Sequence, residues 1–594
     1  MSKSPQTKEP GRQRVVRVRL HPGDFAEALH ITSRMPVIDA IADILDGARR
    51  GPKRPLPWRA LFVAMYLAGA SDSTREHYTQ MHSMLCSLTP SQRHALGVRR
   101  VTFTYSQIES GMQTLADEMG HPVVRDSKTG RPKTVNGMVV RRDGKLLANG
   151  IDQQLIANEW VAASLPDGLT PSDTVAIDST DYETWAARRS RTTLQDVDET
   201  VDDLETSTEC EDGPVDAFAT HRPTGRRFPY TNPHDKRLRH SVDPDATDGY
   251  RAGKRMERKN VFLGYDVHLC ADIARHDGKL LPGLVRSIVV APAGSHKGDA
   301  GMELLRRAEC NTGTKIDKVV CDRGYSMAAA DRWARPLIDM GIVQHHDLGK
   351  AETRLQPSNY AGVIILDGRP TVASLPKRRK ALRRPGLNAS ADEVAASLAA
   401  YDERSAYVFK PFGKPRKSGS QRYQGPASLR IRQLRCINWP ESMRFPDSLP
   451  LSNCLPEQEC HCGGTITIQK SDSSIKHRQP FEYGTTKWLE AYGPRSIVES
   501  INAQLKYHHT NVAHGSTRVF GLIKNTILLG ALVAVMNTSV IRSAYGVDLA
   551  DPATWPEAGM ALVPLADRNY KNIGHGAPAA SEPPDPPPPI TPQA

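Results

Sequence analysis

The chain has 594 residues, which is enough for three or four domains, and its 39% hydrophobic content fits a globular protein with long polar insertions. Its net charge of +12 favours a polyanionic partner, with nucleic acid first and an anionic membrane second. The polar first residues lack the apolar stretch of a secretory signal, and the longest apolar run, 526–536, is too short to span a bilayer. The 9 cysteines are odd in number and scattered, which indicates a reducing compartment. These features argue against a secreted or membrane-spanning protein and predict a cytoplasmic one.

The N-terminal part is predicted to be helical. Residues 1–20 are basic and contain proline, as in a flexible arm, whereas residues 21–165 carry helical patterns. Within them Thr89 is suited to an N-cap with Pro90 at the first helical position, and Gly97 can end that helix. Short helices beside basic residues suit a helical DNA-binding domain, such as a helix-turn-helix variant. A plain helical bundle fits the pattern equally well.

An α/β pattern follows over residues 170–348. Short apolar runs alternate with amphipathic helical patterns, which predicts a mixed sheet with flanking helices. The predicted strands cover 173–181, 260–269, 283–292, 318–325 and 342–347, and the predicted helices cover 299–310 and 327–340. Residues 191–260 turn first acidic and then basic with few apolar side chains, so we expect a flexible insertion there.

Residues 349–480 break this rhythm. They are basic and combine one predicted helix, 391–401, with short strands and loops, as in a β-rich insertion domain. The α/β part is expected to resume over residues 484–548, which end in a largely apolar helix or pair of helices. The proline-rich tail, 576–594, is expected to be disordered.

The stretch around Glu499 predicts an amphipathic helix that begins at Gly493-Pro494, because proline at the first helical position loses no hydrogen-bond donor. One face is apolar and is formed by Ile497, Val498, Ile501 and Leu505. The opposite face presents a carboxylate between two cations and consists of Arg495, Glu499, Asn502 and Lys506.

Two aspartates complement this carboxylate. Asp178 and Asp322 each follow an apolar strand pattern and are predicted to lie at strand ends, where they can meet one face of the later helix. Three carboxylates supply the hard oxygen ligands that suit two Mg²⁺ or Mn²⁺ ions. The sequence therefore predicts a metal-dependent phosphodiester-cleaving site formed by Asp178, Asp322 and Glu499.

These residues resemble the acidic triad of DDE transposases. The spacing Tyr492-x2-Arg495-x3-Glu499-x6-Lys506 matches the signature of the IS4-type group, and the segment following Cys321 resembles the second-Asp motif of these enzymes. The likeness covers roughly residues 170–540 and implies a ribonuclease-H-like catalytic domain. The long insertion after Asp178, which is first acidic and then basic, is not part of the minimal pattern of this family.

The resemblance also implies roles for single residues. Glu499 would complete the metal site, Arg495 and Lys506 would hold phosphates, and Tyr492 would contact a distorted DNA end from the loop before the helix. The aromatic residues Trp439 and Trp488 are candidates for supporting strand separation, although burial in a core is the preferred interpretation.

A second cluster contains Cys436, Cys454, Cys460, His461 and Cys462. Its thiols and imidazole could bind structural Zn²⁺, but their spacing is not a paired C-x-x-C arrangement. The sequence therefore favours ordinary reduced cysteines over zinc.

Together, these features predict a transposase that cuts the terminal inverted repeats of its own element in double-stranded DNA and joins them to target DNA, as a homodimer in the active complex. Two alternatives remain: a transposase-derived DNA-binding protein that no longer cuts, and a ribonuclease-H-like nuclease without strand transfer. The intact acidic triad argues against the first alternative, because DNA binding alone does not require three convergent carboxylates. The second alternative shares the same site but would give cut products and never joined ones.

Overall fold

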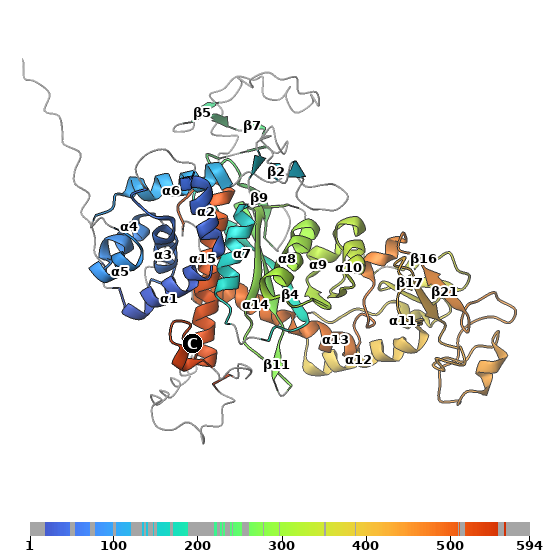
Figure 1. Ribbon diagram of the computed structural model, residues 1–594. Coiled ribbons are helices and arrows are strands. Elements are labelled where there is room, and N and C mark those ends of the chain that lie inside the picture. Colours follow the sequence, from blue (N-terminus) through green and yellow to red (C-terminus); the bar gives the residue numbers. More distant parts are fainter. Residues whose placement is uncertain are drawn as a thin grey trace, which may run out of the picture.

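The computed structural model comprises three neighbouring parts: N-terminal helices on one side, a central sheet, and a region of small sheets on the other side (Figure 1). The structure describes residues 18, 20–47, 54–71, 78–98, 102–119, 134–135, 138–140, 146–147, 151–166, 170–187, 219–221, 226–228, 230–231, 238–239, 241–251, 261–276, 278–295, 297–349, 352–353, 355–386, 388–508, 510, 512, 517–555 and 564–565. The predicted tail, almost all of the predicted arm and most of the insertion at 191–260 lie outside these residues.

The central sheet has the strand order β13-β10-β4-β14-β15, and β9 also pairs with β10. β4 is antiparallel to β10, which is antiparallel to β13, whereas β14 runs parallel to both β4 and β15. The strand bounds are β4 Thr174–Glu183, β9 Thr247–Tyr250, β10 Val261–Asp272, β13 Val285–Pro292, β14 Lys318–Cys321 and β15 Val343–His346. This mixed sheet confirms the predicted α/β class and the approximate positions of four of the five predicted strands. The predicted strand 318–325 is correct only as far as Cys321, because Asp322 caps a short helix at Arg323–Ser326.

Strand β4 is longer than expected, so the prediction that Asp178 ends a strand is wrong. The strand continues to Glu183, because its residues beyond Asp178 pair with β10. The parallel neighbour β14, in contrast, pairs with β4 only as far as Ile177. Asp178 therefore lies in mid-strand, at the point where β4 extends beyond its parallel partner.

Helices cover both faces of the sheet, as the alternation of side chains along β4 requires. Val175 and Ile177 point to one face and pack with α8 (Lys297–Thr312) and α10 (Ala334–Met340), whereas Ala176 points to the other. That second face is covered by α7 (Gln153–Ala163), α14 (Ser496–Ala503) and α15 (Leu522–Val540). The predicted helix 327–340 forms only in its second half, as α10, after a 3₁₀ turn at Ala330–Arg332.

The N-terminal helices form one apolar core with α15 and part of α7. The helices that contribute to this core are α1 Pro22–Ser33, α2 Pro36–Gly47, α3 Trp58–Gly69, α4 Tyr78–Ser87 and α6 Tyr105–Met119, whereas α5 Pro90–Ala95 has no buried residue. The expected cap of α5 is confirmed, since Thr89 and Gln92 form a capping box and Gly97 has a φ of +65°. The long helix α15 lies between these helices and the sheet (Figure 1), so the N-terminal helices pack on the rest of the chain through a shared core.

Among the described helices, one candidate for crossing a membrane is found by length and composition, at Leu522–Tyr545. Within this protein 78% of its apolar window is buried. It packs against α3, α7 and β13. This burial is that of a core helix, as expected for residues 526–536.

Residues 349–480 form two three-stranded antiparallel sheets with helices between them. The sheets are β16 Gln356–Pro357, β17 Val363–Leu366 and β18 Arg369–Val372, and then β19 Lys410–Pro411, β20 Gln421–Gln424 and β21 Thr465–Ile468. The helices are α11 Lys377–Lys380 and α12 Ala391–Arg404, which confirms the predicted helix there. The two sheets share one apolar core, which includes Phe409 and Ile466.

The remaining short elements are two-stranded or three-stranded pairings, four-residue or seven-residue helices, and single turns. They are β1 Thr134–Val135, β2 Met138–Val140, β3 Leu146–Leu147, β5 Ala219–His221, β6 Arg226–Phe228, β7 Tyr230–Thr231, β8 Leu238–Arg239, β11 Arg275–His276, β12 Lys279–Leu280, α9 Arg323–Ser326 and α13 Thr486–Tyr492.

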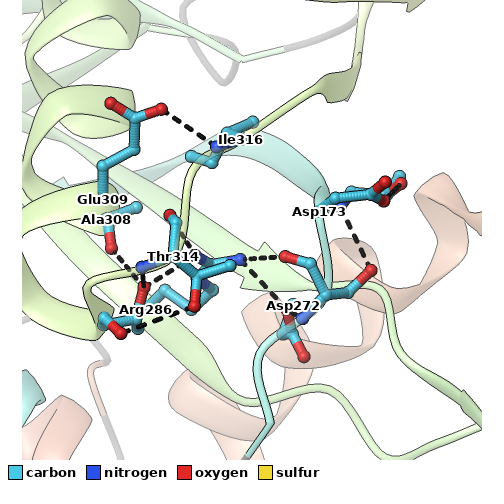
Figure 2. Close-up of polar contacts among 10 residues, drawn as sticks. Asp173, Asp272, Arg286, Ala308, Glu309, Thr314 and Ile316 are labelled. Atoms are coloured by element: carbon cyan, nitrogen blue, oxygen red, sulfur yellow. Dashed lines mark hydrogen bonds and ion pairs between the residues drawn. The ribbon is translucent and has the colours of Figure 1, made fainter.

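A buried ion pair fixes the end of the sheet opposite the candidate site. The fully buried Arg286 of β13 donates to Asp272 of β10 at 3.2 Å and to the backbone oxygen of Thr314 at 3.3 Å (Figure 2). It also donates to the Ser172 oxygen and to Thr312 Oγ1, both at 2.7 Å. This network ties β10 and β13 to the loops before β4 and after α8.

Candidate active site

Asp178 and Asp322 lie next to each other at the C-terminal end of the parallel pairing between β4 and β14. Cys321 pairs with Ile177, so the following residues of β14 and β4 are neighbours across the sheet. Asp322 is the N-cap of α9 and accepts the Gly324 N–H at 2.8 Å, while Asp178 accepts the Ser179 N–H at 2.8 Å. Burial, and then the negative charge of Asp322, raise the pKa of Asp178 to about 6. Burial is therefore the main reason that the charged form of Asp178 is disfavoured, and the neighbouring Asp322 carboxylate adds to this effect.

The predicted Glu499 helix is part of a longer helical path. α13 ends at Tyr492, a 3₁₀ turn spans Gly493–Arg495, and α14 begins at Ser496. Tyr492 therefore lies on a helix, and the prediction that it reaches the site from a loop is wrong. The backbone stays helical through Gly493. The ring of Pro494 removes an N–H and disfavours an uninterrupted α-helix, which accounts for the 3₁₀ turn.

The two faces predicted for this helix are confirmed. Its apolar residues are buried against the sheet: Ile497, Val498, Ile501 and Leu505. Two of its polar residues contact β4: Arg495 Nη1 lies 4.0 Å from Asp178 Oδ2, and Asn502 Nδ2 donates to the same oxygen at 3.3 Å. Arg495 also pairs with Glu499, whose side chain is 53% exposed. One guanidinium therefore links two of the three predicted acids.

Lys506 contacts an acid other than Glu499. It lies in a π-helical turn, Gln504–His508, and its Nζ donates to Asp181 Oδ1 at 2.6 Å. Arg251 donates to Asp181 Oδ2 at 2.9 Å and also pairs with Glu183. Burial acts to raise the pKa of Asp181, but Lys506 and Arg251 hold it below its ordinary value. The cation proposed from sequence to hold phosphate is thus bound to β4 in the free protein.

The aromatic residues near the site form a rigid support. Tyr492 stacks on Trp488, with ring centroids 4.8 Å apart, and the Arg495 guanidinium lies over the Tyr492 ring at 5.7 Å. Trp488 is fully buried and donates to Gln479 at 3.0 Å, which confirms the core interpretation for this tryptophan. Trp439 is partly buried in the core of residues 349–480 and packs closely against Gly463.

Lys297, at the start of α8, is a site residue that the sequence analysis missed. Its charge acts on Asp178 and opposes the rise in the pKa of that carboxyl. Its ammonium is also close to the turn after Asp322, since a Cβ added at Gly324 would lie 3.0 Å from Lys297 Nζ. No motif marks this lysine, and it lies two residues before the predicted helix 299–310, whereas the helix in the structure begins at Lys297 itself.

The acidic residues have the right chemistry for a hard divalent cation, but they do not form a closed ligand set. Asp178 and Asp322 are adjacent, whereas Glu499 is paired with Arg495. Across the described ranges, the carboxylate oxygens of the three acids are not grouped within 4.8 Å of one another. A cation at Asp178 and Asp322 therefore fits the donor chemistry, and recruiting Glu499 requires its separation from Arg495.

Four cysteine thiols, in contrast to the three acids, do lie close together. The ligand atoms of Cys436, Cys454, Cys460 and Cys462 all lie within 4.8 Å of one another, so these four residues could hold a metal ion. All four cysteines are free thiols, as expected from the sequence, but their convergence makes a zinc site more plausible than their spacing suggested. The sequence spacing was misleading because loops of different length bring the thiols together. His461 is directed elsewhere, and its Nδ1 forms a 2.8 Å hydrogen bond with the Ala361 oxygen.

The chain was compared with known proteins in three ways. A scan against protein-family models, a search of curated proteins and a search of solved structures each gave no match.

Proposed function

We propose that this protein is a metal-dependent DNA transposase of the DDE type with a ribonuclease-H-like catalytic unit. The strand order supports this proposal: three antiparallel strands, β13, β10 and β4, are followed by the parallel strands β14 and β15. Helices lie on both faces of the sheet, and two candidate acids lie on its central neighbouring strands. This arrangement is compatible with the fold that the sequence resemblance implies.

The observation that carries the proposal is the meeting of Asp178 with Asp322 beside the polar face of α14. Three segments far apart in the chain bring a carboxylate pair, an arginine and a third carboxylate to the end of β14, beside the middle of β4. DNA binding alone does not need two adjacent, partly desolvated carboxylates, which cost stability. A nuclease or transposase site does need them.

Asp178, Asp322 and Glu499 would hold Mg²⁺ or Mn²⁺. In two-metal sites such ions activate the attacking water or 3′-hydroxyl and stabilise the leaving oxygen of the phosphodiester. The chain itself orients Asp178 through the Ser179 N–H and the Asn502 amide. Because Arg495 is paired with carboxylates, it is placed to exchange them for a DNA phosphate when cations neutralise the acids.

The remaining roles concern DNA. Lys506 and Arg495 supply positive charge next to the acids, and the Trp488–Tyr492 stack holds Tyr492 beside Arg495. The net charge of +12 adds a general attraction for DNA. The partner would be double-stranded DNA, both terminal repeats and target, in the nucleoid of the cytoplasm. Joining two ends requires two active sites, which implies a homodimer in the active complex.

A cleavage and joining assay tests the proposal. Purified full-length protein is incubated with a supercoiled plasmid that carries the DNA flanking its own gene, together with Mg²⁺, Mn²⁺ or EDTA. We expect cuts at defined positions in that DNA with Mg²⁺ or Mn²⁺ and joined products with a second plasmid. Metal-dependent cuts without joining would indicate a nuclease instead. Binding that persists in EDTA, with no cuts in Mg²⁺ or Mn²⁺, would indicate a DNA-binding protein that no longer cleaves.

A further inference from the structure

The four converging thiols lie in the least regular part of the region 349–480. Between β20 and β21, the regular structure is limited to one short 3₁₀ helix, Pro440–Arg444, and a bridge between Arg435 and Leu451. Cys436 and Cys462 are fully buried, Cys454 is nearly so and Cys460 is half-buried. So long a segment with so little secondary structure needs another source of stability.

The distances between the thiols match those of a tetrahedral metal centre. Cys436 Sγ lies 3.8 Å from Cys460 Sγ, and Cys454 Sγ lies 3.6 Å from Cys462 Sγ. Zinc–sulfur bonds of about 2.3 Å place the sulfurs of a regular tetrahedron about 3.8 Å apart. These two separations, with all four sulfurs within 4.8 Å of one another, fit four thiolates around one ion.

The surroundings of the thiols are also built for this position. Ser374 Oγ, which follows β18, lies 3.0 Å from Cys454 Sγ, where its hydroxyl can donate to a thiolate. The backbone packs so closely that a Cβ at Gly425 would lie 2.2 Å from the Cys462 oxygen, and one at Gly362 would lie 2.9 Å from Cys460. The chain is therefore held tightly on several sides of the cluster.

We propose that Cys436, Cys454, Cys460 and Cys462 bind one structural Zn²⁺ ion, which fixes the loops of residues 425–464 to the two small sheets. Four cysteine ligands leave no open position for a substrate, so this ion would have no part in DNA cleavage. Zinc in particular is favoured by four soft thiolates in tetrahedral array, with no redox partner required. The proposal is independent of the transposase activity.

Metal analysis of the full chain tests it. The protein is purified under reducing conditions without a metal-affinity step, and its metal content is measured by mass spectrometry. We expect about one zinc per chain, as in other closed four-cysteine sites. Cys454→Ser and Cys460→Ser should lose most of this zinc. Cys310→Ser, which removes an exposed thiol outside the cluster, should retain it.

A second measurement does not depend on whether the variants fold. Wild-type protein prepared with Co²⁺ in place of zinc should show intense sulfur-to-cobalt charge-transfer absorption and the strong visible bands of tetrahedral cobalt. Three results would each overturn the proposal. The wild-type protein could contain no zinc, or iron in its place; the cobalt spectrum could be octahedral; or the freshly purified protein could contain Cys436–Cys460 and Cys454–Cys462 disulfides. Unchanged zinc in both cluster variants would do the same.

Discussion

Arg495 lies 4.0 Å from the Asp178 carboxylate, the most perturbed acid of the candidate site. The same guanidinium pairs with Glu499, so it acts as a counterion for two of the three candidate acids. In a metal-bound site this role would pass to the cations, and Arg495 would be free to bind phosphate. The free protein thus has a charge arrangement suited to exchange.

Replacing Arg495 tests this exchange. Arg495→Ala should reduce metal-dependent DNA cleavage by about 10²-fold or more, as expected when a charged group at the reacting phosphate is lost. The measurement is the initial rate of plasmid cutting at saturating Mg²⁺. Arg275→Ala is the matched control. Arg275 is exposed in the β11–β12 hairpin, where its guanidinium donates to the backbone oxygen of Gly278. Equal rates for both variants would contradict the role given to Arg495.

Removing the charge of Asp178 should stabilise the metal-free protein. The pKa of this carboxyl is raised from 3.8 to about 6, so ionisation favours the unfolded chain. Asp178→Asn should therefore increase the free energy of unfolding at pH 7 by about 1–3 kcal/mol. Asn502 Oδ1, which has no hydrogen-bond partner, can turn to accept from the new amide.

The stabilisation expected for Asp178→Asn should depend on pH. The carboxyl of the wild type imposes no penalty below pH 3.8, where it is protonated in both states, and the full penalty above about 6. The advantage of Asp178→Asn should hence vanish toward low pH when stability is followed by denaturant unfolding. Asp299→Asn, an exposed control at the start of α8, should change stability by less than about 0.5 kcal/mol. A destabilised Asp178→Asn protein at pH 7 would be incompatible with this account.

Freeing Lys506 should strengthen DNA binding. Asp181→Asn removes one negative charge and the acceptor that holds Lys506 at 2.6 Å. We expect a several-fold higher affinity for duplex DNA at low salt, with the gain decreasing as salt is added, because the contact is made with phosphates. Fluorescence anisotropy with EDTA present measures binding without cleavage. Asp173→Asn, an exposed change at the other end of β4, should give no such gain.

The Arg286 network should dominate stability at the far end of the sheet. Arg286→Met leaves Asp272 buried without its cation and should cost about 3–5 kcal/mol. Arg306→Met on α8 removes an exposed arginine whose partner Glu303 keeps its pair with Arg307, and should cost less than about 1 kcal/mol. Denaturant unfolding compares the two, and similar losses would show that the buried pair has no special weight.

Local sequence patterns predicted most of the sheet and the orientation of α14. Apolar runs located the five main strands, and the 3.6-residue period separated the buried Ile501 from the polar Asn502. Pairing that depends on distant partners was not predictable. β4 continues beyond Asp178 only because β10 lies beside it, and the helical path through Pro494 depends on packing against the sheet.

The candidate site was predicted in its residues but not in its contacts. Spacing identified Glu499 and its two cations, yet it could not show that Lys506 binds Asp181 or that Lys297 approaches Asp322. The cysteine cluster shows the same limit, because the convergence of Cys436 with Cys460 depends on how the intervening loops fold. Such long-range contacts have no signature in local composition.

The central claim is that Asp178, Asp322 and Glu499 form one metal-dependent cleavage site. It is tested most directly by the plasmid assay with the DNA flanking the gene, comparing wild type with Asp178→Asn, Asp322→Asn and Glu499→Gln, and with Asp299→Asn as control. We predict that wild type and the control cut this DNA with Mg²⁺ or Mn²⁺, whereas the three variants bind it without cutting. Cleavage at the wild-type rate by any of the three variants would contradict the claim.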